Sequence, residues 1–173
     1  MASLRPGRCY VDVKNKPYTR ISTRRPRKSY VKGVPTSKIH QFEVGNIKGD
    51  FPLAYHLVSK ENVQIRSNSL EAARVIATKY LTKKLGESGF FLKILVYPHH
   101  VLRENSMATG AGADRFSQGM RRSFGRPIGQ AAIVSEGQRL ITVKVPANAA
   151  DTVKEALRRA GTKLPASCSV VAG

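Results

Sequence analysis

The sequence is poor in acidic residues. It contains 11 Asp and Glu against 30 Lys and Arg, which gives a formal net charge of +19 at pH 7. Such an excess of one sign opposes compact folding by self-repulsion. Nucleic acid is the polyanion that best relieves it, because each neutralised phosphate releases counterions and adds affinity. A solvated basic surface without a partner is the alternative.

Long hydrophobic runs and cysteine pairs are also missing. No stretch approaches the roughly 18 apolar residues that span a bilayer. The first residues, MASLRPGRCYVDVKNK, lack the apolar core of a signal peptide, so we expect a cytoplasmic protein. Cys9 and Cys168 form neither a CxxC pair nor a zinc spacing. We expect free thiols, and a disulfide between the two ends is the alternative.

The motifs of catalysis and of cofactor binding are absent too. His99 and His100 are adjacent, so in an extended chain they point in opposite directions and do not grip one metal ion. Gly110-Ala-Gly112 lacks the rest of GxGxxG, since Arg115 stands where the last glycine belongs. We therefore predict no enzyme, no metal and no cofactor. A phosphate-binding enzyme that uses this glycine-rich loop, and a membrane-surface protein, are the competing hypotheses.

The first 34 residues form a basic extension that carries tyrosines and prolines among its charges. Arginine binds phosphate through its planar fork, and tyrosine offers a ring on which an unstacked base can lie. A solubility tail, or a localisation signal at 24–28, is the simpler interpretation. We expect RNA contacts from Arg5, Arg8, Tyr10, Lys16, Tyr18, Arg20, Arg24, Arg25, Arg27, Lys28, Tyr30 and Lys32.

Residues 35–173 are expected to fold as one domain. Hydrophobic periodicity predicts helices over 70–85 and 149–160, and strands over 54–58, 63–66, 90–97, 128–135, 139–145 and 167–171. The turn Glu136-Gly137-Gln138 predicts that the strands on its two sides form a hairpin. Each helix follows a pair of strands, which favours an α+β two-layer sandwich with both helices on one face of a mainly antiparallel sheet.

A loop of roughly thirty residues, 98–127, interrupts this domain. Loops of this length are commonly functional or disordered. Its glycines allow the backbone to approach RNA closely, and lysine is absent from it. The residues of this segment that we expect to contact RNA are His99, His100, Arg103, Arg115, Arg121, Arg122 and Arg126.

Several long segments carry a family resemblance: RPGRCYVDV at 5–13, the basic stretch at 16–46, YPHHVLRENSMATGAGADRFSQGMRRSFGRP at 97–127, and KLP at 163–165. They resemble the archaeal and eukaryotic large-subunit ribosomal protein family called L-ten-e, the counterpart of bacterial L-sixteen. The absence of an extended tail after Gly173 favours the archaeal form.

The resemblance implies an α+β sandwich with an exposed loop. It implies binding to large-subunit rRNA near the A-site tRNA and the peptidyl-transferase region, beside other large-subunit proteins. It further implies that residues 101–119 reach toward the P-site tRNA, so that the loop histidines and arginines named above contact tRNA or the active centre. The resemblance also implies that the protein joins the subunit late. RNA is the catalyst there, so the resemblance also implies no enzyme.

Overall fold

The structure is a computed structural model that describes residues 5–12, 31, 33–108, 110–115 and 118–173. Within these residues, one sheet has five strands and every pairing in it is antiparallel. In spatial order its strands are β1 (Glu43–Gly45), β4 (Phe91–Ile94), β7 (Arg139–Val145), β2 (Leu53–Ser59) and β8 (Cys168–Ala172).

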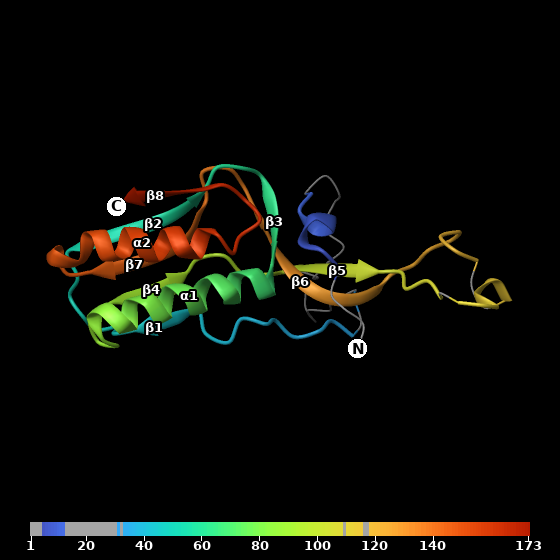
Figure 1. Ribbon diagram of the computed structural model, residues 1–173, viewed down its shortest axis with the longest axis horizontal. Helices are drawn as coiled ribbons and strands as arrows, with labels where there is room; N and C mark the ends of the chain where they lie inside the picture. Colours follow the sequence, from blue (N-terminus) through green and yellow to red (C-terminus); the bar gives the residue numbers. More distant parts are fainter. Residues whose placement is uncertain (1–4, 13–30, 32, 109, 116–117) are drawn as a thin grey trace, which may run out of the picture.

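Two helices, α1 (Ser67–Leu85) and α2 (Ala150–Gly161), lie side by side on one face of this sheet (Figure 1). Each buries one stripe: Leu70, Ala73, Ala77 and Leu81 in α1, and Val153, Ala156, Leu157 and Ala160 in α2, all at 0% exposure. The alanines leave room for the helices to approach each other, and the leucines and valine fill the space above the sheet. The predicted α+β two-layer sandwich is therefore confirmed.

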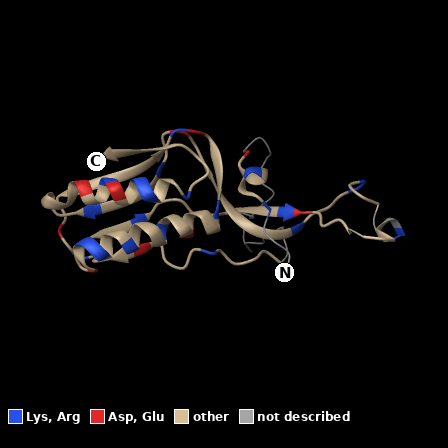
Figure 2. Cartoon of the chain, in the orientation of Figure 1, with Lys and Arg blue, Asp and Glu red and all other residues tan. Residues whose placement is uncertain are grey.

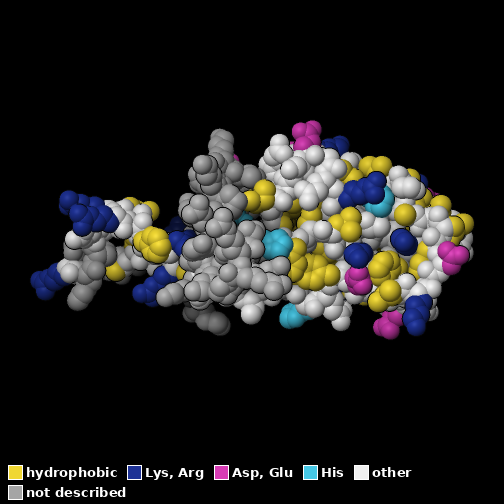
Figure 3. Space-filling view, turned by 180° about the vertical axis from the view of Figure 1, so that it is seen from behind, with side chains coloured by type: hydrophobic (Ala, Val, Ile, Leu, Met, Phe, Trp, Pro, Cys, Tyr) yellow, Lys and Arg dark blue, Asp and Glu magenta, His cyan; other side chains and the backbone are white. Residues whose placement is uncertain are grey.

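The opposite face of the five-stranded sheet is not covered by either helix. Strand register places exposed Lys93 and Lys144 on this face, because their neighbours Leu92 and Val143 point toward the helices. In Figure 3, hydrophobic side chains gather on the back of the molecule, with Lys and Arg side chains between them.

A second sheet of the described chain has three strands in the order β3 (Val63–Arg66), β6 (Arg126–Val134) and β5 (His100–Glu104). Strands β5 and β6 form a hairpin that projects away from the sandwich (Figure 1). Short 3-10 helices occur at Gly7–Tyr10, Ala113–Arg115 and Ala147–Ala149. Among the described helices, none has the length and apolar character needed to cross a bilayer.

The predicted hairpin of strands 128–135 and 139–145 is wrong. β6 pairs with β3 and β5, whereas β7 pairs with β2 and β4. The β2–β3 and β6–β7 connections lie against each other: the Gly137 N–H donates to the Ser59 carbonyl at 2.9 Å, and the Ser59 N–H donates to the Gln138 carbonyl at 3.1 Å. The segment that joins β2 to β3 and the segment that joins β6 to β7 thus run together as one long ribbon. This ribbon bends at Ser59 and Gly137, and its strands belong to both sheets.

The predicted loop 98–127 is shorter than expected. Its first part forms β5 and its end begins β6, which leaves residues 105–125 as the tip of the hairpin. The sequence concealed β5 because Val101 and Leu102, which follow each other, are both buried, at 1% and 5% exposure. A strand covered on both faces lacks the alternation that reveals strands. The three-residue strand β1 was also missed.

Candidate nucleic-acid interface

The hairpin tip, residues 105–125, concentrates positive charge far from the body (Figure 2). Arg115, Arg121 and Arg122 are exposed, and Arg126 is exposed where the chain re-enters β6. Asp114 is the single acid in this segment of the sequence. Backbone hydrogen bonds close tight turns here, among them Arg121 N–H to Gln118 O at 3.3 Å. The tip is thus a short, arginine-bearing projection that can meet a polyanion.

The root of the hairpin is closely packed. The Arg103 guanidinium lies 4.7 Å from the centroid of the Phe124 ring, which is 77% exposed. Gly125 passes so near to the other arm that a β-carbon there would lie 2.9 Å from the Glu104 nitrogen. Only glycine allows this approach, and it fixes the distance between the two arms where the tip begins.

The N-terminal segment 5–12 packs on this root. Arg5 donates through Nε to Glu104, and the Tyr10 hydroxyl donates to the other Glu104 oxygen at 3.0 Å. From β3, Arg66 donates to the Arg5 carbonyl at 2.9 Å, and Gln64 donates to the Tyr10 carbonyl at 2.7 Å. We call Arg5, Tyr10 and Glu104 the root cluster. It joins the start of the chain to β5 across 94 residues of sequence or more.

These contacts shift the protonation of the root cluster. The Arg5 hydrogen bond, helped by Tyr10, lowers the pKa of the Glu104 carboxyl, and Glu104 in turn raises the pKa of Arg5. Burial, followed by the hydrogen bond to Glu104, raises the pKa of Tyr10. The acid at the root is therefore ionised and already bound within the protein. It does not stand as a free negative charge against RNA.

The two adjacent histidines of the predicted site, His99 and His100, lie in different environments. His100 is buried at 6% exposure, its Nδ1 contacts the Gln64 amide oxygen, and burial lowers its pKa. Its side chain thus connects β5 with β3 across the intervening strand β6. His99 is exposed, and its ring centroid lies 4.5 Å from that of Tyr97.

The described structure brings Arg5, Arg8 and Tyr10 to the root of the hairpin, where Arg8 is exposed on its 3-10 helix. The other residues predicted for the extension lie outside the described residues: Lys16, Tyr18, Arg20, Arg24, Arg25, Arg27, Lys28, Tyr30 and Lys32. The contacts of Arg5 and Tyr10 with Glu104 went unforeseen, because partners separated so far in the sequence leave no local pattern.

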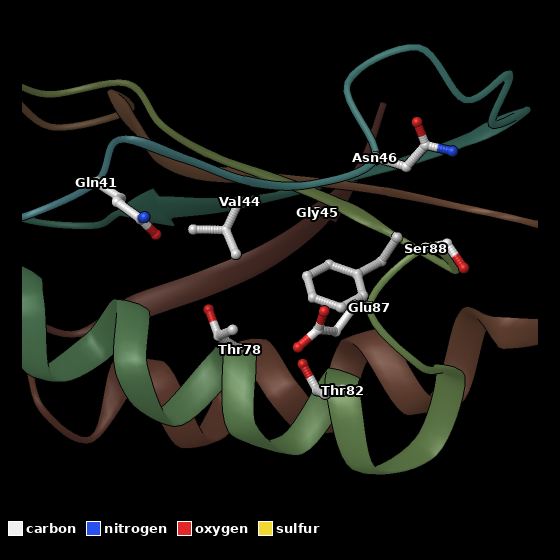
Figure 4. Close-up of a pocket in the computed structure, with 9 residues that line it drawn as sticks. Gln41, Val44, Gly45, Asn46, Thr78, Thr82, Glu87 and Ser88 are labelled. Carbon is white, nitrogen blue, oxygen red and sulfur yellow. The ribbon is translucent and has the colours of Figure 1, made fainter.

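One cavity lies beside the hairpin and another lies within the sandwich. The first, of about 540 Å³, lies between the N-terminal segment, the start of α1 and the β5–β6 hairpin. Its charged lining residues are Arg5, Lys38, Arg66, Glu71 and Glu104. The other, of about 530 Å³, lies between β1 and α1. Figure 4 shows Thr78, Thr82 and Glu87 around the second cavity, whose described lining contains no Lys or Arg. Of the two, only the first has Lys or Arg in its described lining.

Within the described residues, no cluster of histidine, cysteine or carboxylate side chains could hold a metal ion. Cys9 is exposed and Cys168 is half-buried, and both are free thiols. Burial raises the pKa of the Cys168 thiol.

Comparison with known proteins agrees with this geometry. The family model described as ribosomal protein L16p/L10e matches residues 14–171. The large ribosomal subunit protein uL16 of Methanococcus aeolicus is 47% identical over 171 residues, which cover 99% of this chain and 95% of that protein. The uL16 proteins of Staphylothermus marinus and Thermofilum pendens are 51% and 50% identical over 168 residues, or 97% of this chain and 92% and 96% of theirs.

These matches run through the extension, the sandwich and the hairpin tip alike. The chain therefore belongs to the ribosomal protein L16p/L10e family, as its resemblance predicted.

Proposed function

We propose that the chain is a structural constituent of the large ribosomal subunit in the cytoplasm. In this proposal it binds large-subunit rRNA near the A-site tRNA and the peptidyl-transferase region. The observation that carries the proposal is the β5–β6 hairpin, which projects an arginine-bearing tip from a compact sandwich (Figures 1 and 2). Family membership and the net charge of +19 support it.

Each part has a distinct task in this proposal. The sandwich is a rigid body that docks beside rRNA and other large-subunit proteins. The extension, residues 1–34, follows the rRNA, with arginines on phosphates and tyrosines against exposed bases. The hairpin tip carries Arg115, Arg121 and Arg122 toward the A- and P-site tRNAs. Guanidinium–phosphate hydrogen bonds are charge-assisted and frequently bidentate, so a few arginines suffice to fix the tip.

The root cluster gives the tip a fixed base. A flexible arm loses conformational freedom when it binds, whereas an arm held at its root loses less. By holding Glu104, the cluster also removes the one acid of β5 from competition with phosphate. In this proposal the hairpin reaches tRNA while the root cluster restricts its movement relative to the sandwich.

The competing hypotheses have less support. The L16p/L10e proteins are ribosomal structural components, so the prediction that the chain is no enzyme is confirmed. A membrane-surface protein needs a helix with an apolar face left free. Here the apolar stripes of α1 and α2 are buried in the core.

The proposal is tested with the substitutions Arg115→Gln, Arg121→Gln and Arg122→Gln in one variant. Binding to a large-subunit rRNA fragment that includes the tRNA-binding region is measured over a series of salt concentrations. Each lost phosphate contact reduces the magnitude of the negative slope of log K against log salt by roughly 0.7–0.9, so we expect that magnitude to fall by about 2–3. A matched control replaces Lys79, Lys83 and Lys84, which are exposed on α1, by glutamine.

The slope of the control variant is expected to differ from that of the unaltered chain by no more than the contribution of one phosphate contact, about 0.7–0.9. Equal decreases in both triple variants would show that binding follows total charge and not the hairpin tip.

The proposal that the protein joins the subunit late is tested by a separate experiment. Depletion of the protein should leave large-subunit particles that sediment near their mature position and lack few other proteins. Early, strongly truncated particles would contradict late joining.

A further inference from the structure

Three aromatic rings form a row at the junction between the sandwich and the hairpin. The ring centroids of Phe42 and Tyr97 lie 5.2 Å apart with an interplanar angle of 19°, which is a stacked pair. The rings of Tyr97 and His99 lie 4.5 Å apart at 44°. We call Phe42, Tyr97 and His99 the aromatic row.

The inner end of the row is fixed by the core. Phe42 is half-buried and packs against the hydrophobic cluster between sheet and helices. Its carbonyl accepts a hydrogen bond from the Ile94 N–H at 2.8 Å, which ties it to the end of β4. A ring held by both its backbone and its packing has little freedom to turn away, so it supports the ring stacked on it.

The outer end of the row faces solvent. Tyr97 is 51% exposed and His99 is exposed. The Tyr97 ring thus places aromatic surface in water at the outer side of a stack whose inner ring is Phe42. Exposed aromatic surface organised in this way is typical of a binding site, because stacking energy remains available to a further planar group.

We propose that the aromatic row is a stacking platform for an unpaired base of RNA. The proposal rests on the proposed function, because it assumes that this chain binds RNA. It adds a contact to a base, whereas the arginines of the tip contact phosphate. Base–aromatic stacking tolerates any sequence, since every base has a π-face. The platform therefore favours single-stranded RNA or a flipped-out base over a continuous duplex.

Position and charge favour RNA over a neighbouring protein as the occupant. His99 directly precedes β5, which leads in five residues to the arginine-bearing tip. At about 3.3 Å per residue, that strand is roughly 17 Å long, so one bound RNA segment can contact both platform and tip. The net charge of +19 concentrates polyanions at the surface and repels other basic proteins.

The test uses the full-length chain with Tyr97→Ala, Tyr97→Phe and the control Leu95→Ala, a neighbouring exposed residue without a ring. Affinity is measured for a mixed-sequence single-stranded RNA and for a fully paired RNA stem of equal length. We expect Tyr97→Ala to weaken single-strand binding about 5- to 100-fold, with the salt dependence unchanged. Tyr97→Phe and Leu95→Ala should keep the unaltered affinity, and stem binding should be insensitive to all three.

Circular dichroism confirms that each variant is folded, and His99→Ala provides a second, more peripheral removal from the row. If folded Tyr97→Ala and His99→Ala bind single strands as well as the unaltered chain, the platform is overturned while the proposed function stands. If the unaltered chain shows no salt-sensitive RNA binding, the proposed function fails and the platform fails with it. A photoreactive residue at position 97 that crosslinks in assembled subunits to protein, rather than to rRNA, would assign the row to a protein partner instead.

Discussion

Replacing Gly45 by alanine should destabilise the protein more than the same change at Gly137. Both glycines have positive φ, +96° and +76°, which an L-residue rarely adopts. A β-carbon at position 45 would lie 2.2 Å from the Phe90 carbonyl oxygen, whereas at position 137 nothing lies within 4 Å. The pair therefore separates backbone strain, which both variants share, from a steric clash that only one has.

The magnitudes follow from these contacts. Left-handed backbone costs an L-residue about 1–2 kcal/mol, so Gly137→Ala should lose about that much stability. The clash at position 45 adds roughly 1–3 kcal/mol, because the obstructing atom is backbone. That carbonyl also accepts the Asn46 N–H at 2.9 Å, so it cannot retreat without loosening the bond between β1 and β4.

Thermal and denaturant unfolding of the two variants provide the measurement. For a chain of this size, 1 kcal/mol corresponds to about 2–4 °C in Tm. Gly45→Ala should therefore melt roughly 2–12 °C below Gly137→Ala. Equal Tm values for the two variants would refute the argument, since they would mean that β1 moves aside without cost.

Three further predictions concern the core, an ion pair and the root cluster. Leu157→Ala should lower the free energy of unfolding by about 2–5 kcal/mol, because Leu157 is 0% exposed between α2 and the sheet. A loss below 1 kcal/mol in chemical denaturation would contradict this packing. Hydrogen bonds from Arg158, and secondly from Arg159, lower the pKa of Glu155 from 4.5 to about 2. Since the folded pKa is the lower one, the stabilisation is complete above pH 4.5 and is lost as the pH falls toward 2. The Tm difference between the unaltered chain and Arg158→Gln should shrink over that interval, and a difference that is constant with pH would count against the ion pair. Glu104→Gln should loosen the N-terminal segment, which limited trypsin digestion would report as faster cleavage after Arg8. An unchanged cleavage rate would mean that other contacts suffice to hold the segment.

The sequence by itself determined the helices, the charge and the family. The apolar stripes of α1 and α2 recur every three to four residues, and that spacing has meaning only in a helix. The arginines of the hairpin tip are local facts of composition, and the long continuous matches to L-ten-e need no structure. Such features depend on neighbours in the chain, so the chain alone reveals them.

The tertiary structure decided what depends on distant partners. Strand pairing is one example: β6 and β7 look like a hairpin, yet each pairs in a different sheet because the ribbon bends at Ser59 and Gly137. The fate of single side chains is another. Adjacent His99 and His100 are alike in sequence, but the folded chain buries His100 against Gln64 and leaves His99 exposed at the end of the aromatic row. Contacts across many tens of residues carry no local signal, and only the folded chain brings them together.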